Sequence, residues 1–282
     1  MEFLTQYEGL LYDLGALVLY LLIFFVAKWL KSVFSSYKLD EQLTEYDNNA
    51  VSVSVAGYFM GVTAIFIGSN GGSGSDPLND FLNVVGYSLA GILLLNLSKI
   101  INDKLILYKF SVDKEIIKDQ NPGTGVVEGA MYLASGLVIG GSISGEGGGP
   151  LTALAFYAIG QICLVLFGLL YVRTSPYDVH AEIEKDNIAA GLGFSGGLIS
   201  IGIIIMKAVS GDFTGWIEDL TALGMDILII FIYLVVVRFI FDKLVLRNSN
   251  LATEISEDQN IGAGLLEMIV AVCFSLTLFF VL

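Results

Sequence analysis

The sequence predicts an all-α integral membrane protein with eight transmembrane helices, and three observations support this fold class. Of the 282 residues, 55% are hydrophobic and only 15% are charged, which is too apolar for a soluble domain of this size. The apolar residues form runs long enough to cross a bilayer as helices, which takes about 20 residues. A short polar signature recurs four times between these runs. We therefore expect the lipid bilayer to be the main environment of the chain.

The apolar runs are continuous and lack the period-two alternation of barrel strands, so helices are the expected spanning elements. Segments rich in Gly and Ser, 69–80 and 145–150, separate some of the runs as turns. The expected helices cover residues 10–36, 48–69, 79–108, 121–144, 151–174, 187–209, 216–246 and 259–281.

The basic residues predict the orientation. Of the 14 Lys and Arg residues, 13 follow an odd-numbered helix or lie at its end, and only Lys207 lies on the other side. By the positive-inside rule the side with 13 is cytoplasmic, so both termini are expected outside. The two longest runs, 79–108 and 216–246, are expected to project beyond the bilayer at their basic ends.

The polar signature divides the chain into repeats. Its fullest form covers residues 119–125, followed by Glu128, and it returns at 258–264, followed by Glu267. These two copies are 139 positions apart, whereas looser copies, matched through Asn49 and Asn187, are 138 apart.

The spacing predicts a duplicated four-helix half, residues 1–146 and 151–282, each half made of two-helix units. Because every unit starts outside, the repeats are expected to be parallel and related by an axis along the membrane normal. This arrangement disfavours a transporter built from inverted repeats.

The Asp and Asn residues of the signature are typical helix N-caps, which accept hydrogen bonds from first-turn N–H groups. Pro122, one position after Asn121, suits the first helical position. An alternative is that the gathered helix N-termini bind a ligand or partner. The adjoining loops are acidic, which favours a cation or a basic partner over an anion. The expected caps are Asn49, Asn121, Asn187 and Asn260.

Small residues recur after each signature at spacings that fall on one helical face. Such stripes allow close helix packing in a bilayer. We therefore expect the second helix of every unit to lie inside and the first to lie outside. The principal glycines are Gly57, Gly129, Gly136, Gly191, Gly202 and Gly264.

Three acids lie within the apolar runs. Glu128 and Glu267 each follow a signature Asn by seven residues, about 10 Å into the helix. A carboxylate at the centre of a spanning helix costs about 2.5–3.5 kcal/mol on insertion scales. The pair therefore predicts either a site for a cation or proton, or carboxyls that snorkel or stay protonated among helix contacts. Asp226 is the third acid, with Lys207 as its expected partner.

Other functions find no support in the sequence. The net charge of -14 and the lack of a basic patch argue against nucleic acid. His180 is the only histidine and is expected in a loop, and both cysteines lie in apolar runs, so neither a metal site nor a catalytic triad is predicted. No cofactor motif is present, and we expect no enzyme activity.

Residues 186–196 and 260–264 resemble the Asn-x-Ala-Ala-x-x-x-Phe-Ser-Gly motif of the YjfL-like family of bacterial inner-membrane proteins. The resemblance implies a multi-pass protein of the bacterial plasma membrane, built from paired two-helix units. It also implies a gene near those for envelope-stress proteins and for ligases of polyamine chemistry. We therefore expect a cytoplasmic stress-response or polyamine-related partner. The family has no established activity and no catalytic residues to transfer.

Two functional hypotheses follow. The first is a membrane protein that handles cations or protons, or responds to membrane stress, with Glu128, Glu267 and Asp226 as the candidate site. The second is a scaffold that transports nothing and recruits a cytoplasmic partner through its acidic loops. A homo-oligomer is compatible with both hypotheses.

Overall fold

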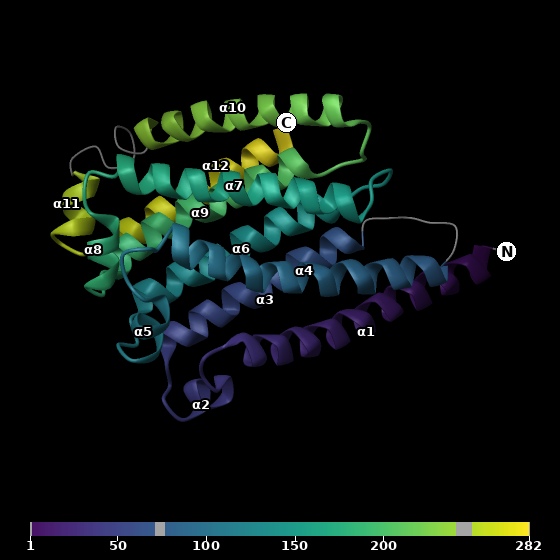
Figure 1. Ribbon diagram of the computed structural model, residues 1–282, viewed down its shortest axis with the longest axis horizontal. Coiled ribbons are helices and arrows are strands. Elements are labelled where there is room, and N and C mark those ends of the chain that lie inside the picture. The colour runs from purple at the N-terminus through teal and green to yellow at the C-terminus, as the bar shows by residue number, and fades with distance from the viewer. Residues whose placement is uncertain (1, 71–76, 241–249, 282) are drawn as a thin grey trace.

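The computed structural model describes residues 2–70, 77–240 and 250–281, and within these ranges it contains helices and no strand. Four times along the chain, a helix of six residues lies between two long helices (Figure 1). The long helices are α1 (Glu2–Phe34), α3 (Asn49–Ser69), α4 (Pro77–Leu105), α6 (Pro122–Ile143), α7 (Pro150–Thr174), α9 (Ile188–Val209), α10 (Trp216–Ile240) and α12 (Ile261–Val281). The short ones are α2 (Leu39–Thr44), α5 (Val112–Ile117), α8 (Val179–Glu184) and α11 (Leu251–Ser256).

Seven of the long helices are apolar and long enough to cross a membrane: α1, α3, α4, α6, α7, α9 and α12. The chain is therefore a multi-pass membrane protein. The long helix α10 occupies most of the predicted run 216–246, whose remainder, with the repeated Asp242 and Lys243, lies outside the described residues. Helix α4 ends at Leu105, three residues before the predicted boundary, and Lys99 near its basic end turns towards buried acids. Whether this end projects beyond the bilayer stays a prediction.

The short helices occupy segments that the sequence predicted to be acidic loops. Each is six residues long, too short for a helical period to stand out in the sequence. Each nevertheless buries an apolar side chain, for example Leu39 on α2 and Ile116 on α5. We call a long helix, the six-residue helix after it and the next long helix a unit, and the end of the molecule where the short helices lie the signature end.

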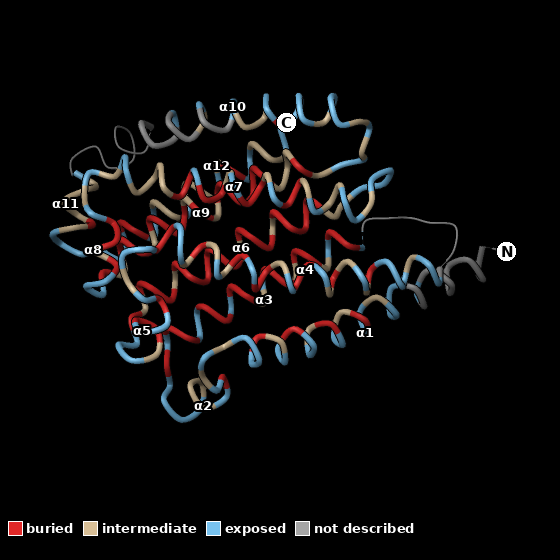
Figure 2. Tube along the Cα trace, in the orientation of Figure 1, coloured by how far each residue is buried: buried red, intermediate tan, exposed pale blue. Residues whose placement is uncertain are grey.

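The second long helices of the units form a row in the order α3, α6, α9 and α12, and the first long helices lie against its outside (Figures 1 and 2). About 56% of the α3 span and 78% of the α6 and α9 spans are buried, against 22% for α1. The predicted inner position therefore holds for three helices. It fails for α12, which is only 11% buried because no further helix covers its far side in the described part of the chain.

Glycines allow the backbones of the row to touch. A Cβ added at Gly57 would overlap the backbone of Gly129, and one at Gly136 would overlap Gly61. The same holds across the next two contacts, where glycines face backbone of the neighbouring helix. The pairs are Gly191 with Gly123, Gly202 with Ala134, and Gly264 with Ala189. No larger side chain fits at these glycines without a backbone shift.

The cap of α3 is Asn48 and not Asn49, so the predicted register of the first signature was wrong by one residue. The Asn48 side chain accepts a hydrogen bond from the N–H of Val51, whereas Asn49 is exposed. The residue before each cap has a positive φ in all four copies, and in the first copy that residue is Asp47. With Asn48 as the cap, the spacing to Asn187 becomes 139, as in the other pair.

Three of the capping amides also join consecutive units. The Asn48 side chain donates to the carbonyl of Ile116 at 2.9 Å, 68 residues along the chain. Asn121 reaches Ile183 and Asn187 reaches Ile255 in the same way, both at 2.7 Å. Asn260, the fourth cap, is exposed and donates to Glu254 within its own unit. The first three caps therefore fix both a helix start and the position of the next short helix.

Replacing Asn121 by Ala is expected to lower the free energy of unfolding by about 2 kcal/mol. Roughly half comes from the lost cap and half from the lost bond to a buried carbonyl. Asn260→Ala is the matched control, because it removes a cap but no contact between units, and about 1 kcal/mol is expected. Equilibrium unfolding in detergent measures both variants, and equal losses would contradict a role for Asn121 between units.

Candidate functional site

Glu128 on α6 is buried and paired. Its side chain is 3% exposed, and its carboxylate lies 3.3 Å from the ammonium nitrogen of Lys99 on α4. The hydroxyl of Ser54 on α3 donates to the second carboxylate oxygen. The buried carboxylate thus contacts a cation and a hydroxyl donor inside the protein. Snorkelling towards the headgroups is therefore wrong for Glu128.

Lys99 is bound by two further acids. Its ammonium nitrogen lies 2.7 Å from Asp103, one turn along α4, and 3.1 Å from Asp113 on α5. We call Lys99, Asp103, Asp113 and Glu128 the ion-pair cluster. Three helices from one unit contribute to it, and α3 of the preceding unit adds Ser54. The sequence reasoning missed all but Glu128, because the members are up to 29 residues apart and on separate elements.

A second lysine lies next to the cluster. Lys31 on α1 is 2% exposed and donates to the Tyr132 hydroxyl at 2.7 Å. Its ammonium also lies 4.4 Å from the centroid of the Tyr132 ring and 5.5 Å from that of Tyr58, within cation–π range. A lysine within a predicted apolar run was the signal that could have revealed it.

Exposure falls from the surface into the bundle along this set of residues. The side chain of Asp113 is 48% exposed, that of Lys99 is 21% and that of Glu128 is 3%. Partial burial raises the pKa of Asp113, but the Lys99 ammonium and the Ser36 hydroxyl lower it more, so the net shift is downward. Asp113 is therefore ionised at neutral pH, and the cluster connects the signature end with a buried carboxylate.

The cluster and Lys31 together contain three carboxyl groups and two amino groups. One carboxylate oxygen from each of Asp103, Asp113 and Glu128 lies within 4.8 Å of the others, a spacing at which they could hold a metal ion. Carboxylates suit Mg²⁺, Ca²⁺ and Mn²⁺. The Lys99 ammonium contacts all three carboxylates, so a metal would have to displace it. One oxygen of Asp103 is buried without a hydrogen-bond partner in the described residues.

Glu267 lies in a different setting on α12. The Tyr171 hydroxyl donates to its carboxylate at 3.2 Å, and Gly193 of α9 lies beside it. The row places α9 between α6 and α12, so Glu267 does not join the ion-pair cluster. Arg238 stands 139 positions after Lys99, but its side chain is not among those described. Leu170 stands at the same spacing from Lys31.

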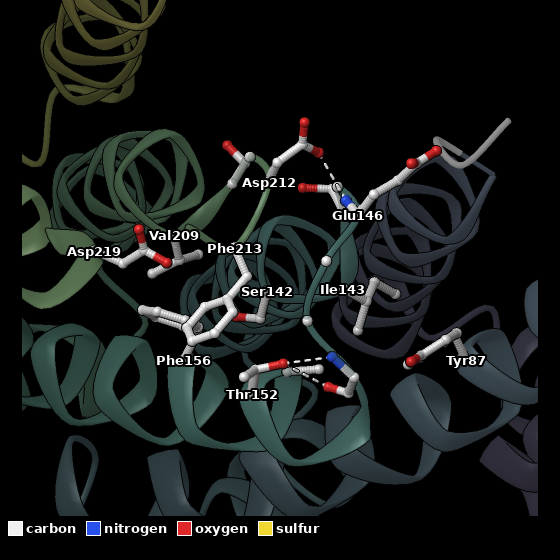
Figure 3. Close-up of a pocket in the computed structure, with 18 of the residues that line it drawn as sticks. Tyr87, Ser142, Ile143, Glu146, Thr152, Phe156, Val209, Asp212, Phe213 and Asp219 are labelled. Atoms are coloured by element: carbon white, nitrogen blue, oxygen red, sulfur yellow. Dashed lines mark hydrogen bonds between the residues drawn. The ribbon is translucent and has the colours of Figure 1, made fainter. Parts of the chain in front are cut away.

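Asp226 lines a cavity of about 590 Å³ at the opposite end of the molecule (Figure 3). Lys207 lines the same cavity, but the described residues show no ion pair between the two. The Lys207 ammonium lies 5.6 Å from the Phe279 ring centroid. Figure 3 shows the Glu146 N–H donating to Asp212, a bond of 2.7 Å that crosses between the halves. The acids that line the cavity are Asp80, Glu146, Asp212, Asp219 and Asp226.

Two further polar residues are structural. His180 lies on α8, and not in a loop as expected, where it is buried with its Nε2 2.7 Å from the Ile106 carbonyl. Burial lowers its pKa, so the imidazole is neutral at pH 7 and donates to that carbonyl. Gln161 donates to Asn102 at 2.7 Å between α7 and α4, the interhelical bond that mid-span amides commonly make.

The repeated units and the buried charges define a multi-pass membrane protein built from duplicated helical segments. A profile of the family described as Domain of Unknown Function (DUF350) matches residues 5–143 and again residues 147–282. The chain belongs to this family. It is also 25% identical over 237 residues to a UPF0719 transmembrane protein of Aquifex aeolicus (strain VF5), covering 83% of this chain and 85% of the relative. No solved structure matches.

Replacing Lys99 by Met is expected to lower the free energy of unfolding by about 3–5 kcal/mol, because Glu128 stays buried without its counter-ion. The double variant Lys99→Met with Glu128→Met is expected to recover most of this loss. Lys109→Met is the matched control, since it breaks an exposed pair with Asp178, and little change is expected. A double variant no more stable than Lys99→Met alone would show that the two charges are not coupled.

Proposed function

We propose that this protein handles protons or small cations at the membrane, with Glu128 in the ion-pair cluster as the central group. The observation that carries the proposal is that three acids and two lysines, formally one negative charge in excess, gather around a buried carboxylate. One added proton or monovalent cation would balance these charges. Buried charge in a spanning segment commonly marks an ion pathway or a proton relay.

The expected orientation gives the cluster a direction. By the positive-inside rule the signature end is cytoplasmic, so Asp113 would face the cytoplasm and Glu128 would lie about 10 Å inside the membrane. The gradient of exposure from Asp113 to Glu128 supports entry of a proton from that side. The acidic lining of the cavity at the other end favours a cation there as well, because its field repels anions.

Proteoliposomes with an internal pH-sensitive dye test the proposal. The wild-type protein is expected to dissipate an imposed pH gradient faster than empty liposomes do. Glu128→Gln should reduce that rate at least tenfold, because the amide cannot exchange a proton. Glu267→Gln is the matched control at the equivalent position of the other half, and its rate should stay within twofold of wild type.

The same vesicles show which ion is transported. With the pH equal on both sides, gradients of Na⁺ or K⁺ reveal a metal cation as the transported species, whereas flux only under a pH gradient indicates the proton. A wild-type rate equal to that of empty liposomes for all three ions, or a Glu128→Gln rate equal to wild type, would remove the proposal. Unfolding curves of each variant show that it is folded.

A scaffold function is the alternative, and the exposed acids at the signature end favour it. These acids lie on or beside the four short helices and leave a negative surface there. They are Asp40, Glu45, Asp47, Asp119, Glu184, Asp186, Glu257 and Asp258. A basic or cationic partner would complement this surface.

Pull-down from solubilised cells tests the scaffold function, with neutralisation of Glu184, Glu257 and Asp258 to their amides expected to abolish capture of the partner. Glu128→Gln serves as the control, because it alters a buried acid and should leave capture unchanged. Capture that survives neutralisation would contradict recruitment by these acids.

A further inference from the structure

The three contacts within the inner row share one construction. Counted from the capping Asn, the residue at position 4 faces the preceding helix, and the residue at position 2 faces the following one. Gly125 thus meets Ala50, Gly191 meets Gly123, and Gly264 meets Ala189. Positions 8 and 9 pair in the same way further along, as Gly129 with Gly57 and Met268 with Gly196.

At the two ends of the row, α12 and α3 each have one face whose contact positions are not covered by a neighbouring helix. On α12, Gly262 at position 2 and Ile269 at position 9 are exposed, and a Cβ at Gly262 would meet only the side chain of Asn260. On α3, Ser52 at position 4 and Ala56 at position 8 are exposed. A small residue therefore faces outward at position 2 of one end and at positions 4 and 8 of the other.

The hydrogen bonds of the capping Asn side chains also stop at the ends of the row. Asn48, Asn121 and Asn187 each donate to a carbonyl on the short helix of the next unit. The Asn260 amide donates to Glu254 of its own unit, and no described residue of another unit accepts from it. Asn48 and Asn187 each donate to a carbonyl that lies five residues before the cap of the next unit. The residue five before Asn48, the first cap, is Leu43 on α2, so the Leu43 carbonyl is the equivalent acceptor in the first unit.

The outer helices repeat the pattern. Gly91 on α4 faces both Ile65 of α3 and Ile139 of α6, so α4 covers the groove between them. Gly160 on α7 faces Val138 of α6 and Ile205 of α9 in the same manner. Helix α1 packs on α3 through Phe24 and Phe59, whose rings are 4.3 Å apart, but no inner helix flanks its other side in the described chain.

We propose that a second copy of this chain docks head to tail, with its α3 against the free face of α12. In this arrangement Gly262 meets Ser52 of the second copy, Ile269 meets Ala56, and Asn260 donates to the carbonyl of Leu43. The α1 helix of the second copy then covers the new groove. The contact continues the interface already made three times within one chain. It uses different surfaces on the two copies, so further copies add in the same direction and form a ring or a row.

Cysteine cross-linking in native membranes tests the proposal, starting from the full chain with Cys163→Ser and Cys273→Ser. The variant carrying both Ala56→Cys and Ile269→Cys is expected to form oxidised dimers and higher multiples, because docking brings the two positions within disulfide reach. Each single cysteine variant should stay monomeric on the same gel, since neither position meets its own copy.

A single variant that cross-links as well as the double would overturn the head-to-tail arrangement in favour of a two-fold contact. Single-molecule photobleaching of labelled protein in dilute liposomes supplies the second measurement. Multiple steps per particle are expected for wild type, with a shift to single steps for Gly262→Leu, which fills the contact. Single steps for wild type, together with no cross-link in the double variant, would overturn the proposal.

Discussion

The close approach of backbones within the row α3, α6, α9 and α12 is the constraint on which the rest of the structure depends. Lipid provides no hydrophobic drive for helices to associate, so packing contacts and hydrogen bonds between helices must hold them. Glycines such as Gly57, Gly129 and Gly136 permit the contact, and the amides of Asn48, Asn121 and Asn187 fix its register. The outer helices then settle into the grooves between neighbours.

This packing also makes the ion-pair cluster possible. Glu128 lies about two turns inside α6, and the contact with α3 brings the Ser54 hydroxyl to it. The groove between the two helices receives α4, which carries Lys99 and Asp103. Buried charges are tolerated only where partners satisfy them. Three long helices and α5 converge at the cluster, and its three carboxyl groups share the Lys99 ammonium.

The two halves have diverged in their polar interior while keeping their packing. The caps remain at a spacing of 139, and Glu267 stands where Glu128 stands in the first half. Yet Leu170 replaces Lys31, and Gly193 replaces Ser54, at the same spacing. The Glu128 carboxyl lies in the ion-pair cluster, whereas the Glu267 carboxyl accepts a hydrogen bond from Tyr171.

The sequence by itself determined the helical class, the spans and the helix starts, because these depend on local properties: apolar length, capping residues and the spacing of small residues. It also identified Glu128 as a candidate site residue, because a carboxylate inside a spanning helix is costly to insert into a membrane. It missed the six-residue helices, whose length gives no periodic signal, and misplaced the first cap by one residue, since Asn48 and Asn49 are chemically identical.

Only the tertiary structure decided which charges meet. Lys31 and Asp113 are 82 residues apart in sequence, and no local pattern brings them to the same carboxylate. The exposed position of α12 likewise follows from the order of the row and not from composition, since α12 is as apolar as the buried α9. Contacts between distant segments depend on how helices pack, and helix packing depends on every neighbour at once.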